Sequence, residues 1–164
     1  MAKLSWTTLA RNGFLFMVPV MIWDSLLTAS LPSMYGNSAE WQAANPGLAL
    51  AENLSRWLVV LLPILMPIRL RTRRQRIGLG VWVAGTAAYF AAWVAVIAWP
   101  GSAWSLGAFG FLAPAYLAFP WLVGIGMMSD RLYVPSPYRW WQYVILSAAF
   151  TVFHTAHFVT IWPG

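Results

Sequence analysis

Long apolar runs separated by short polar segments dominate the chain. Each run has roughly 20 residues, and at about 1.5 Å rise per residue a helix of that length crosses a hydrocarbon core of about 30 Å. Helices are expected because lipid offers no hydrogen-bond partners to an open backbone. The pattern predicts an all-α, polytopic transmembrane helical bundle that forms a single domain over residues 1–164. The expected spans are 13–31, 48–68, 78–99, 106–128 and 139–162.

Composition agrees with this pattern. The chain is 60% hydrophobic and only 9% charged, whereas a soluble domain carries roughly a quarter charged residues. The net charge of +6 does not indicate a nucleic-acid partner, because basic residues collect in the cytoplasmic loops of membrane proteins. The chain contains no cysteine, which excludes disulfides, thiol catalysis and cysteine-ligated metals.

The distribution of Lys and Arg predicts the orientation of the bundle. Nine of the ten basic residues lie before the first span, between the second and third, or between the fourth and fifth. We therefore expect an integral membrane protein with a cytoplasmic N-terminus and an outer C-terminus, in a bacterial inner membrane. The arginines at 69–76 are sufficiently explained by their role in setting the topology. Contact between these arginines and anionic lipid head groups is an additional expectation.

Small residues and prolines indicate how the spans are shaped. Ala84, Ala88 and Ala92 recur every four residues on the third span, a spacing that lets two helix backbones approach closely. Five prolines lie inside predicted spans, where each is expected to kink or interrupt its helix. They are Pro19, Pro63, Pro67, Pro114 and Pro120.

Ionisable residues inside the spans are the candidates for function, because such groups are costly in hydrocarbon and normally face the bundle interior. Each of them is expected about 6 to 12 Å below the outer end of its span. Three separate spans would thus place polar groups in one layer of the outer half. The residues are Asp24, Glu52, Arg56, His154 and His157, with Asn53, Ser25, Thr28 and Thr155 at similar depth.

Spacing predicts which of these groups meet. Glu52 and Arg56 are four residues apart on one helix face and can form an ion pair, which would either hold the bundle together or belong to a binding site. Asp24 is expected to be protonated, or to meet Arg56 or a histidine from another span. His154 and His157 can share a helix face. A metal site would need Glu52 or Asp24 as a third ligand; hydrogen bonds from the histidines to carboxylates or carbonyls are the preferred interpretation, and we expect no metal.

Two stretches resemble the EXPERA membrane domain of sigma-2-receptor and emopamil-binding proteins. The matching positions are Asp24 followed by Leu31, Pro32 and Tyr35, then Glu52 early in the second span, and Ala113-Pro114 followed by Leu117 and Pro120. The resemblance covers the first four spans and implies a bundle that encloses an apolar, sterol-type ligand cavity, with Asp24 and Glu52 as its acids. The fifth span and the Glu52–Arg56 pair depart from the pattern, and neither histidine matches the isomerase's catalytic histidine, so catalysis is not carried over.

The sequence therefore predicts a small membrane protein that binds a lipid-like or sterol-like apolar molecule in an intramembrane pocket. An accessory subunit of a larger membrane assembly, or a homo-oligomer, fits the short loops and many aromatics equally well. A transporter or proton pathway is less favoured because the five spans show no inverted repeat. No catalytic residue or cofactor is assigned. The predicted ligand-binding residues are Asp24, Glu52, Asn53, Arg56, Tyr116, His154 and His157.

Overall fold

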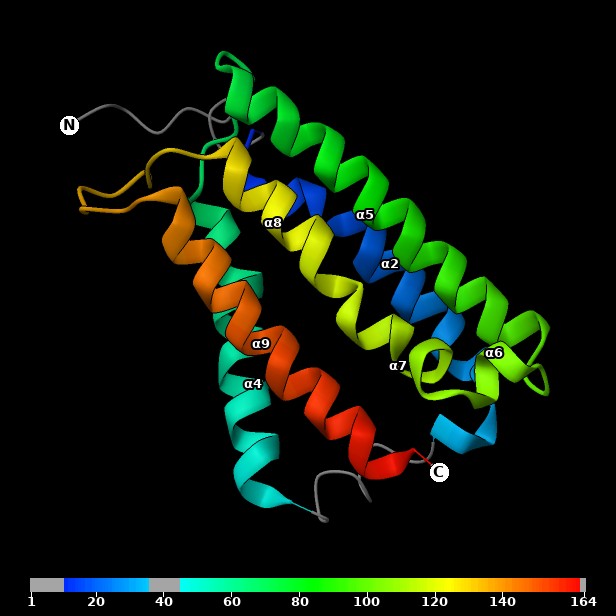
Figure 1. The fold of residues 1–164 in the computed structure, drawn as a ribbon. Coiled ribbons are helices and arrows are strands. Elements are labelled where there is room, and N and C mark those ends of the chain that lie inside the picture. Colours follow the sequence, from blue (N-terminus) through cyan, green and yellow to red (C-terminus); the bar gives the residue numbers. More distant parts are fainter. Residues whose placement is uncertain (1–10, 36–44, 163–164) are drawn as a thin grey trace.

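The computed structural model describes residues 11–35 and 45–162, and every regular element within them is helical (Figure 1). Five helical segments are long and apolar enough to cross a membrane, which confirms the predicted all-α bundle. Their bounds are Gly13–Ser30, Pro46–Leu65, Arg73–Ala98, Ala108–Met128 and Trp140–Ile161.

Several spans are built from more than one helix. The first comprises η1 (Gly13–Phe16), α2 (Val18–Leu27) and η2 (Thr28–Ser30), and η3 (Ser33–Tyr35) follows it. The second comprises α4 (Pro46–Leu61) and η4 (Leu62–Leu65), and the third is the single helix α5 (Arg73–Ala98). After the short α6 (Ala103–Leu106), the fourth span divides into α7 (Ala108–Tyr116) and α8 (Ala118–Met128), and the fifth is α9 (Trp140–Ile161).

Prolines account for most of these divisions. Pro19 lies in the first turn of α2, and Pro63 lies where α4 gives way to η4. Pro114 lies inside α7, which ends two residues later. A proline removes one backbone donor and its ring clashes with the preceding turn, so a regular helix does not continue unchanged through it. The predicted interruptions are therefore present, except that Pro67 lies beyond the second span in the segment that leads to α5.

The third span begins at Arg73, earlier than the predicted residue 78. Thr72 caps the helix by accepting a hydrogen bond from Gln75 N at 3.3 Å. The Gln75 side chain in turn accepts from Thr72 N at 3.1 Å, which completes a capping box. Because the helix is capped at Thr72, its first turns include Arg73, Arg74 and Arg76 and are therefore basic.

Glycine allows α5 and α8 to pack closely, and this is the most extensive helix contact among the described residues. A Cβ atom added at Gly85 would lie 2.6 Å from Trp121 N, and one added at Gly124 would lie 2.5 Å from Trp82 N. The predicted alanine stripe is wrong in part, because Ala84 and Ala88 are exposed on the outer face of α5. A repeat of four residues drifts around a helix of 3.6 residues per turn, and the glycines are the smaller residues on the buried face.

The basic segments meet at one end of the bundle. Arg69 N donates to Met128 O at 3.2 Å and Ile68 N donates to Arg11 O at 2.9 Å, which brings the ends of the first, second and fourth spans together. Arg74 donates to Met127 O at 2.8 Å and forms an ion pair with Asp130. The clustering of basic residues that the sequence indicated is thus a feature of the fold.

Candidate site: a cavity between two helix groups

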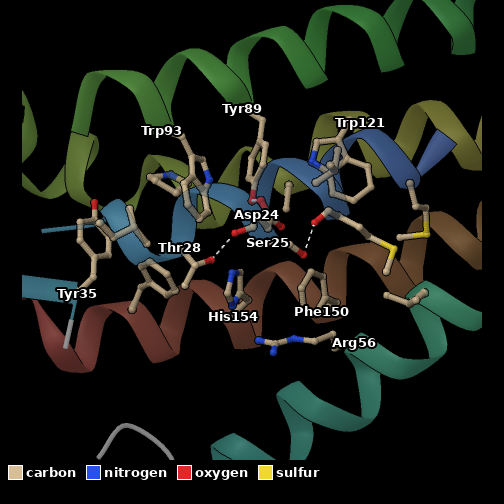
Figure 2. A pocket seen from close by; sticks show the side chains of 18 of the residues that line it. Asp24, Ser25, Thr28, Tyr35, Arg56, Tyr89, Trp93, Trp121, Phe150 and His154 are labelled. Carbon is tan, nitrogen blue, oxygen red and sulfur yellow. Dashed lines mark hydrogen bonds between the residues drawn. The ribbon is translucent and has the colours of Figure 1, made fainter. Parts of the chain in front are cut away.

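A cavity of about 710 Å³ lies around the middle of the membrane spans (Figure 2). It is enclosed by α2 and α5 on one side, by α4 and α9 on the other, and by the α7–α8 junction. Asp24 from α2, Arg56 from α4 and His154 from α9 contribute charged or titratable side chains to its lining. Three helices that are distant in sequence therefore bring polar groups to one space, as their common depth predicted.

The remaining wall is mainly apolar and aromatic. Tyr89 and Trp93 of α5, Trp121 of α8 and Phe150 of α9 line the cavity and are each less than 9% exposed. The Tyr89 ring packs edge-on against Trp121 with centroids 6.3 Å apart. An apolar pocket with a few polar groups on its wall is the usual form of a small-molecule site, and its volume lies within the range of about 300–1,000 Å³ that such sites occupy.

Asp24 is held by a partner that the sequence did not indicate. The Tyr89 hydroxyl donates a hydrogen bond to Asp24 Oδ1 at 2.8 Å, joining α2 to α5. One turn further along α2, the Thr28 hydroxyl donates to the Asp24 main-chain oxygen. The hydrogen bond from the Tyr89 hydroxyl restrains the rotamer of the Asp24 side chain. The second carboxyl oxygen of Asp24 is therefore held in a defined orientation at the cavity wall.

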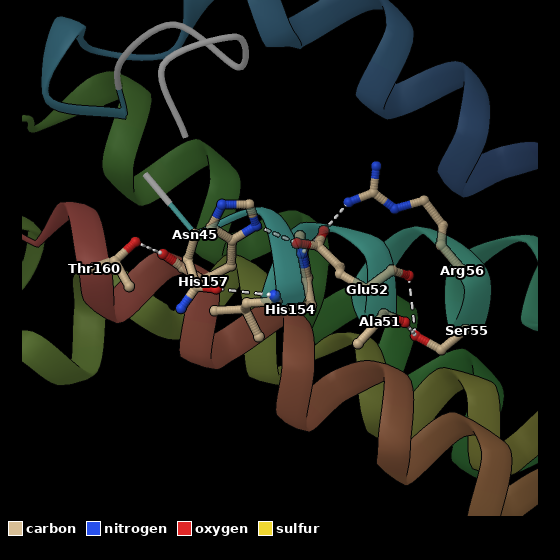
Figure 3. A network of polar contacts seen from close by, with 9 residues as sticks. Asn45, Ala51, Glu52, Ser55, Arg56, His154, His157 and Thr160 are labelled. Atoms are coloured by element: carbon tan, nitrogen blue, oxygen red, sulfur yellow. Dashed lines mark hydrogen bonds and ion pairs between the residues drawn. The ribbon is translucent and has the colours of Figure 1, made fainter. Parts of the chain in front are cut away.

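Glu52 is the centre of a second polar cluster, shown in Figure 3. Its side chain is about 5% exposed and forms an ion pair with Arg56 on the same helix. His154 Nδ1 lies 2.9 Å from Glu52 Oε1, and His157 Nδ1 contacts Oε2. The predicted i, i+4 ion pair and the shared face of the two histidines are both present. One carboxylate therefore joins α4 to α9 through two histidines, while its third partner, Arg56, lies on α4 itself.

Arg56 differs from the expectation of a buried cation. Its side chain is 45% exposed, although the Glu52 side chain beside it is not. The guanidinium lies 6.0 Å from the centroid of the Phe150 ring, at the edge of the cavity. Its Nη2 group donates a hydrogen bond to Glu52 on the same helix, whereas the Phe150 ring that its guanidinium faces belongs to α9.

The predicted site residues fall into three groups. Asp24, Arg56 and His154 line the cavity, whereas Glu52 and His157 are not among the lining residues and lie behind them in the wall. Asn53 and Tyr116 are also not among the lining residues. Sequence reasoning missed the aromatic residues of α5, α8 and α9, which carry no charge to distinguish them from other residues of a membrane span.

The titratable cluster does not have the arrangement of a metal centre. Within residues 11–35 and 45–162, no group of three or more His, Cys, Asp or Glu side chains is placed to hold a metal ion. Both histidines face Glu52 through Nδ1, which is the hydrogen-bonded arrangement that the sequence favoured. No family model, curated protein or solved structure matches the chain.

Proposed function

We propose that this membrane protein binds a lipid-like or sterol-like apolar molecule in the cavity between α2, α4, α5 and α9. The observation that carries the proposal is the placement of Asp24, Arg56 and His154 on the wall of an otherwise mainly apolar cavity of about 710 Å³. The aromatic and aliphatic wall suits the body of such a ligand. The three polar side chains suit its polar end, because a few oriented polar groups normally fix a ligand's direction in a pocket.

The Glu52 cluster, which lies behind the cavity wall, supports this proposal because it positions two of the lining residues. Glu52 contacts Arg56 and His154, and both of those residues line the cavity. A buried carboxylate that holds two lining residues pre-organises them, which lowers the entropic cost of binding. The EXPERA resemblance points to the same function and implies Asp24 and Glu52 as the acids of the cavity. Here Asp24 lies on the cavity wall, whereas Glu52 lies behind it and contacts the lining residues Arg56 and His154.

Native mass spectrometry of the purified protein tests the proposal. We expect a small apolar molecule to co-purify, and we expect Ala118→Phe to reduce its occupancy by about tenfold, because Ala118 lines the cavity and is 5% exposed. The matched control is Ala84→Phe, which adds the same ring to an exposed position on α5. Equal occupancy in the two variants, or spectra that contain stoichiometric partner proteins and no small molecule, would favour the accessory-subunit function instead.

We also propose that the arginine-rich end of the bundle faces the cytoplasm and that the membrane is a bacterial inner membrane. Eight of the nine clustered basic residues belong to described segments at that end: Arg11, Arg69, Arg71, Arg73, Arg74, Arg76, Arg131 and Arg139. The positive-inside rule supports the proposal, since basic residues near the ends of spans set the orientation.

Cysteine labelling in intact cells measures this orientation, and the absence of native cysteine makes the experiment clean. Gly101 and Ser136 are both exposed and lie in loops at opposite ends of the bundle. We expect Gly101→Cys to react with an impermeant maleimide added outside, and Ser136→Cys to react only after the cells are permeabilised. The reverse result would show that the bundle is inverted.

A further inference from the structure

The two sides of the cavity are each held together internally. On one side, α2 is joined to α5 by the Asp24–Tyr89 hydrogen bond and by Trp23 stacked on Phe90, with ring centroids 4.1 Å apart. On the other side, α4 is joined to α9 by the Glu52 cluster and by Tyr143, whose hydroxyl donates to Val59 O at 3.0 Å. The cavity lies where these two pairs face each other.

Within the described residues, the two flanks between the pairs differ in how closely their helices pack. On one flank α9 packs against both α7 and α8. On the other flank, within the described residues, η1 packs against η4, but α2 and α4 share few close backbone contacts. We call this second flank the α2–α4 gap, and its margins are Met21, Ser25 and Thr28 on α2 and Arg56 and Val60 on α4.

The margins of the α2–α4 gap are continuous with the outer surface of the bundle. Ser25 lines the cavity and is itself exposed, and Leu26, the next residue, is 71% exposed. Arg56 lines the cavity from α4, and the next residue, Trp57, is 62% exposed. Successive helix residues are about 100° apart around the axis. On both helices, therefore, the wall of the cavity turns directly into the surface that faces outward.

The gap lies within the length of two membrane spans. Ser25 is inside the span Gly13–Ser30, and Arg56 is inside the span Pro46–Leu65. A side opening at this level meets lipid rather than water, because the surrounding hydrocarbon core extends over the length of both spans.

We propose that the α2–α4 gap is a lateral entrance through which the cavity takes its ligand from the bilayer. The ligand is then a membrane-dissolved amphiphile with one apolar body and one polar end, rather than a water-borne metabolite. The apolar body passes between the two helices, and the polar end meets Ser25 and Arg56 at the margin and Asp24 on the cavity wall. The identity of the ligand rests on the proposed function, whereas the route can be measured without any bound ligand.

Alkylation of a cysteine at the back of the cavity measures the route. Ala118→Cys places a thiol on the wall formed by α8. We expect a bilayer-soluble octyl maleimide to modify it in proteoliposomes. Adding Ser25→Trp, which narrows the entrance, should slow that modification by about tenfold. Adding Leu26→Trp instead should leave the rate unchanged, because Leu26 is an adjacent outward-facing residue that does not line the cavity.

Two results would overturn the entrance. One is the same octyl maleimide rate with and without Ser25→Trp. The other is modification of the Ala118→Cys variant by a charged, water-soluble maleimide as fast as by octyl maleimide when both faces of the membrane are accessible, because that result requires a route from water. If octyl maleimide reaches the cavity laterally but no small molecule co-purifies, the lateral entrance is supported and the proposed ligand-binding function is contradicted. Failure of the lateral entrance is therefore distinguishable from failure of the proposed function.

Discussion

Replacing Glu52 by glutamine is expected to lower the free energy of unfolding by about 3 kcal/mol, because removing one partner of a buried ion pair leaves the other uncompensated. The single carboxylate of Glu52 contacts Arg56, His154 and His157. Glutamine has nearly the same shape but carries no charge and only one acceptor oxygen. The expected cost lies at the low end of the range for buried pairs, since Arg56 is 45% exposed and can be solvated in part.

Asp130→Asn is the matched control for this substitution. Asp130 also forms an ion pair with an arginine, Arg74, but its side chain is 47% exposed. An exposed pair contributes about 0–1 kcal/mol, so the two acid-to-amide changes should differ by at least about 2 kcal/mol. Unfolding of both variants in mixed micelles, followed by circular dichroism, measures the difference. Equal losses of stability would mean that the Glu52 cluster does not hold α4 to α9.

Replacing Gly85 by leucine is expected to disrupt the α5–α8 contact. The first added carbon, Cβ, would lie 2.6 Å from Trp121 N and 2.9 Å from Pro120 Cβ. Those are a backbone atom and a rigid ring, which cannot move aside as a flexible side chain can. Overpacking in a well-packed interior costs about 1–3 kcal/mol and occasionally more. A leucine at a backbone contact belongs to the upper part of that range, so we expect little folded protein to be recovered.

Gly80→Leu provides the comparison for Gly85→Leu within the same helix. A Cβ atom at Gly80 would meet nothing within 4 Å, and the residue is exposed. Leucine favours a helix over glycine by roughly 0.5–1 kcal/mol, so this variant should be at least as stable as the parent. Recovery of monodisperse protein by size-exclusion chromatography, followed by thermal unfolding, measures both. Normal recovery and stability of Gly85→Leu would contradict the close approach of α5 and α8.

The number and class of the spans could be predicted from the sequence because both depend on local composition. Long apolar runs and clustered arginines are visible without any knowledge of packing. The start of α5 was placed too late because charged residues were assigned to the loop, whereas Thr72 and Gln75 form a capping box that extends the helix through them. The alanine stripe failed for a similar reason, since spacing alone does not say which face of a helix is buried.

The candidate site could be predicted only through its charges. Depth along each span brought Asp24, Arg56 and His154 to one level, and spacing predicted the ion pair of Glu52 with Arg56. The partner of Asp24 was missed because Tyr89 is one of many aromatics, and only the packing of α2 against α5 makes it the donor. Whether a residue lines the cavity or stands behind its wall, as Glu52 does, also depends on helix rotation, which the sequence does not specify.

Peptide mapping of photo-crosslinks tests the central claim, ligand binding in the cavity, most directly. The protein is reconstituted in nanodiscs with a trace of a long-chain alcohol that carries a diazirine near its polar end, and the crosslinked residues are identified by mass spectrometry. We predict saturable crosslinks to cavity residues of α2, α4 and α9, such as Ser25, Arg56 and Phe150. Crosslinks confined to outward-facing residues, such as Leu26, Trp57 and Val152, and rising without saturation as probe is added, would contradict the account.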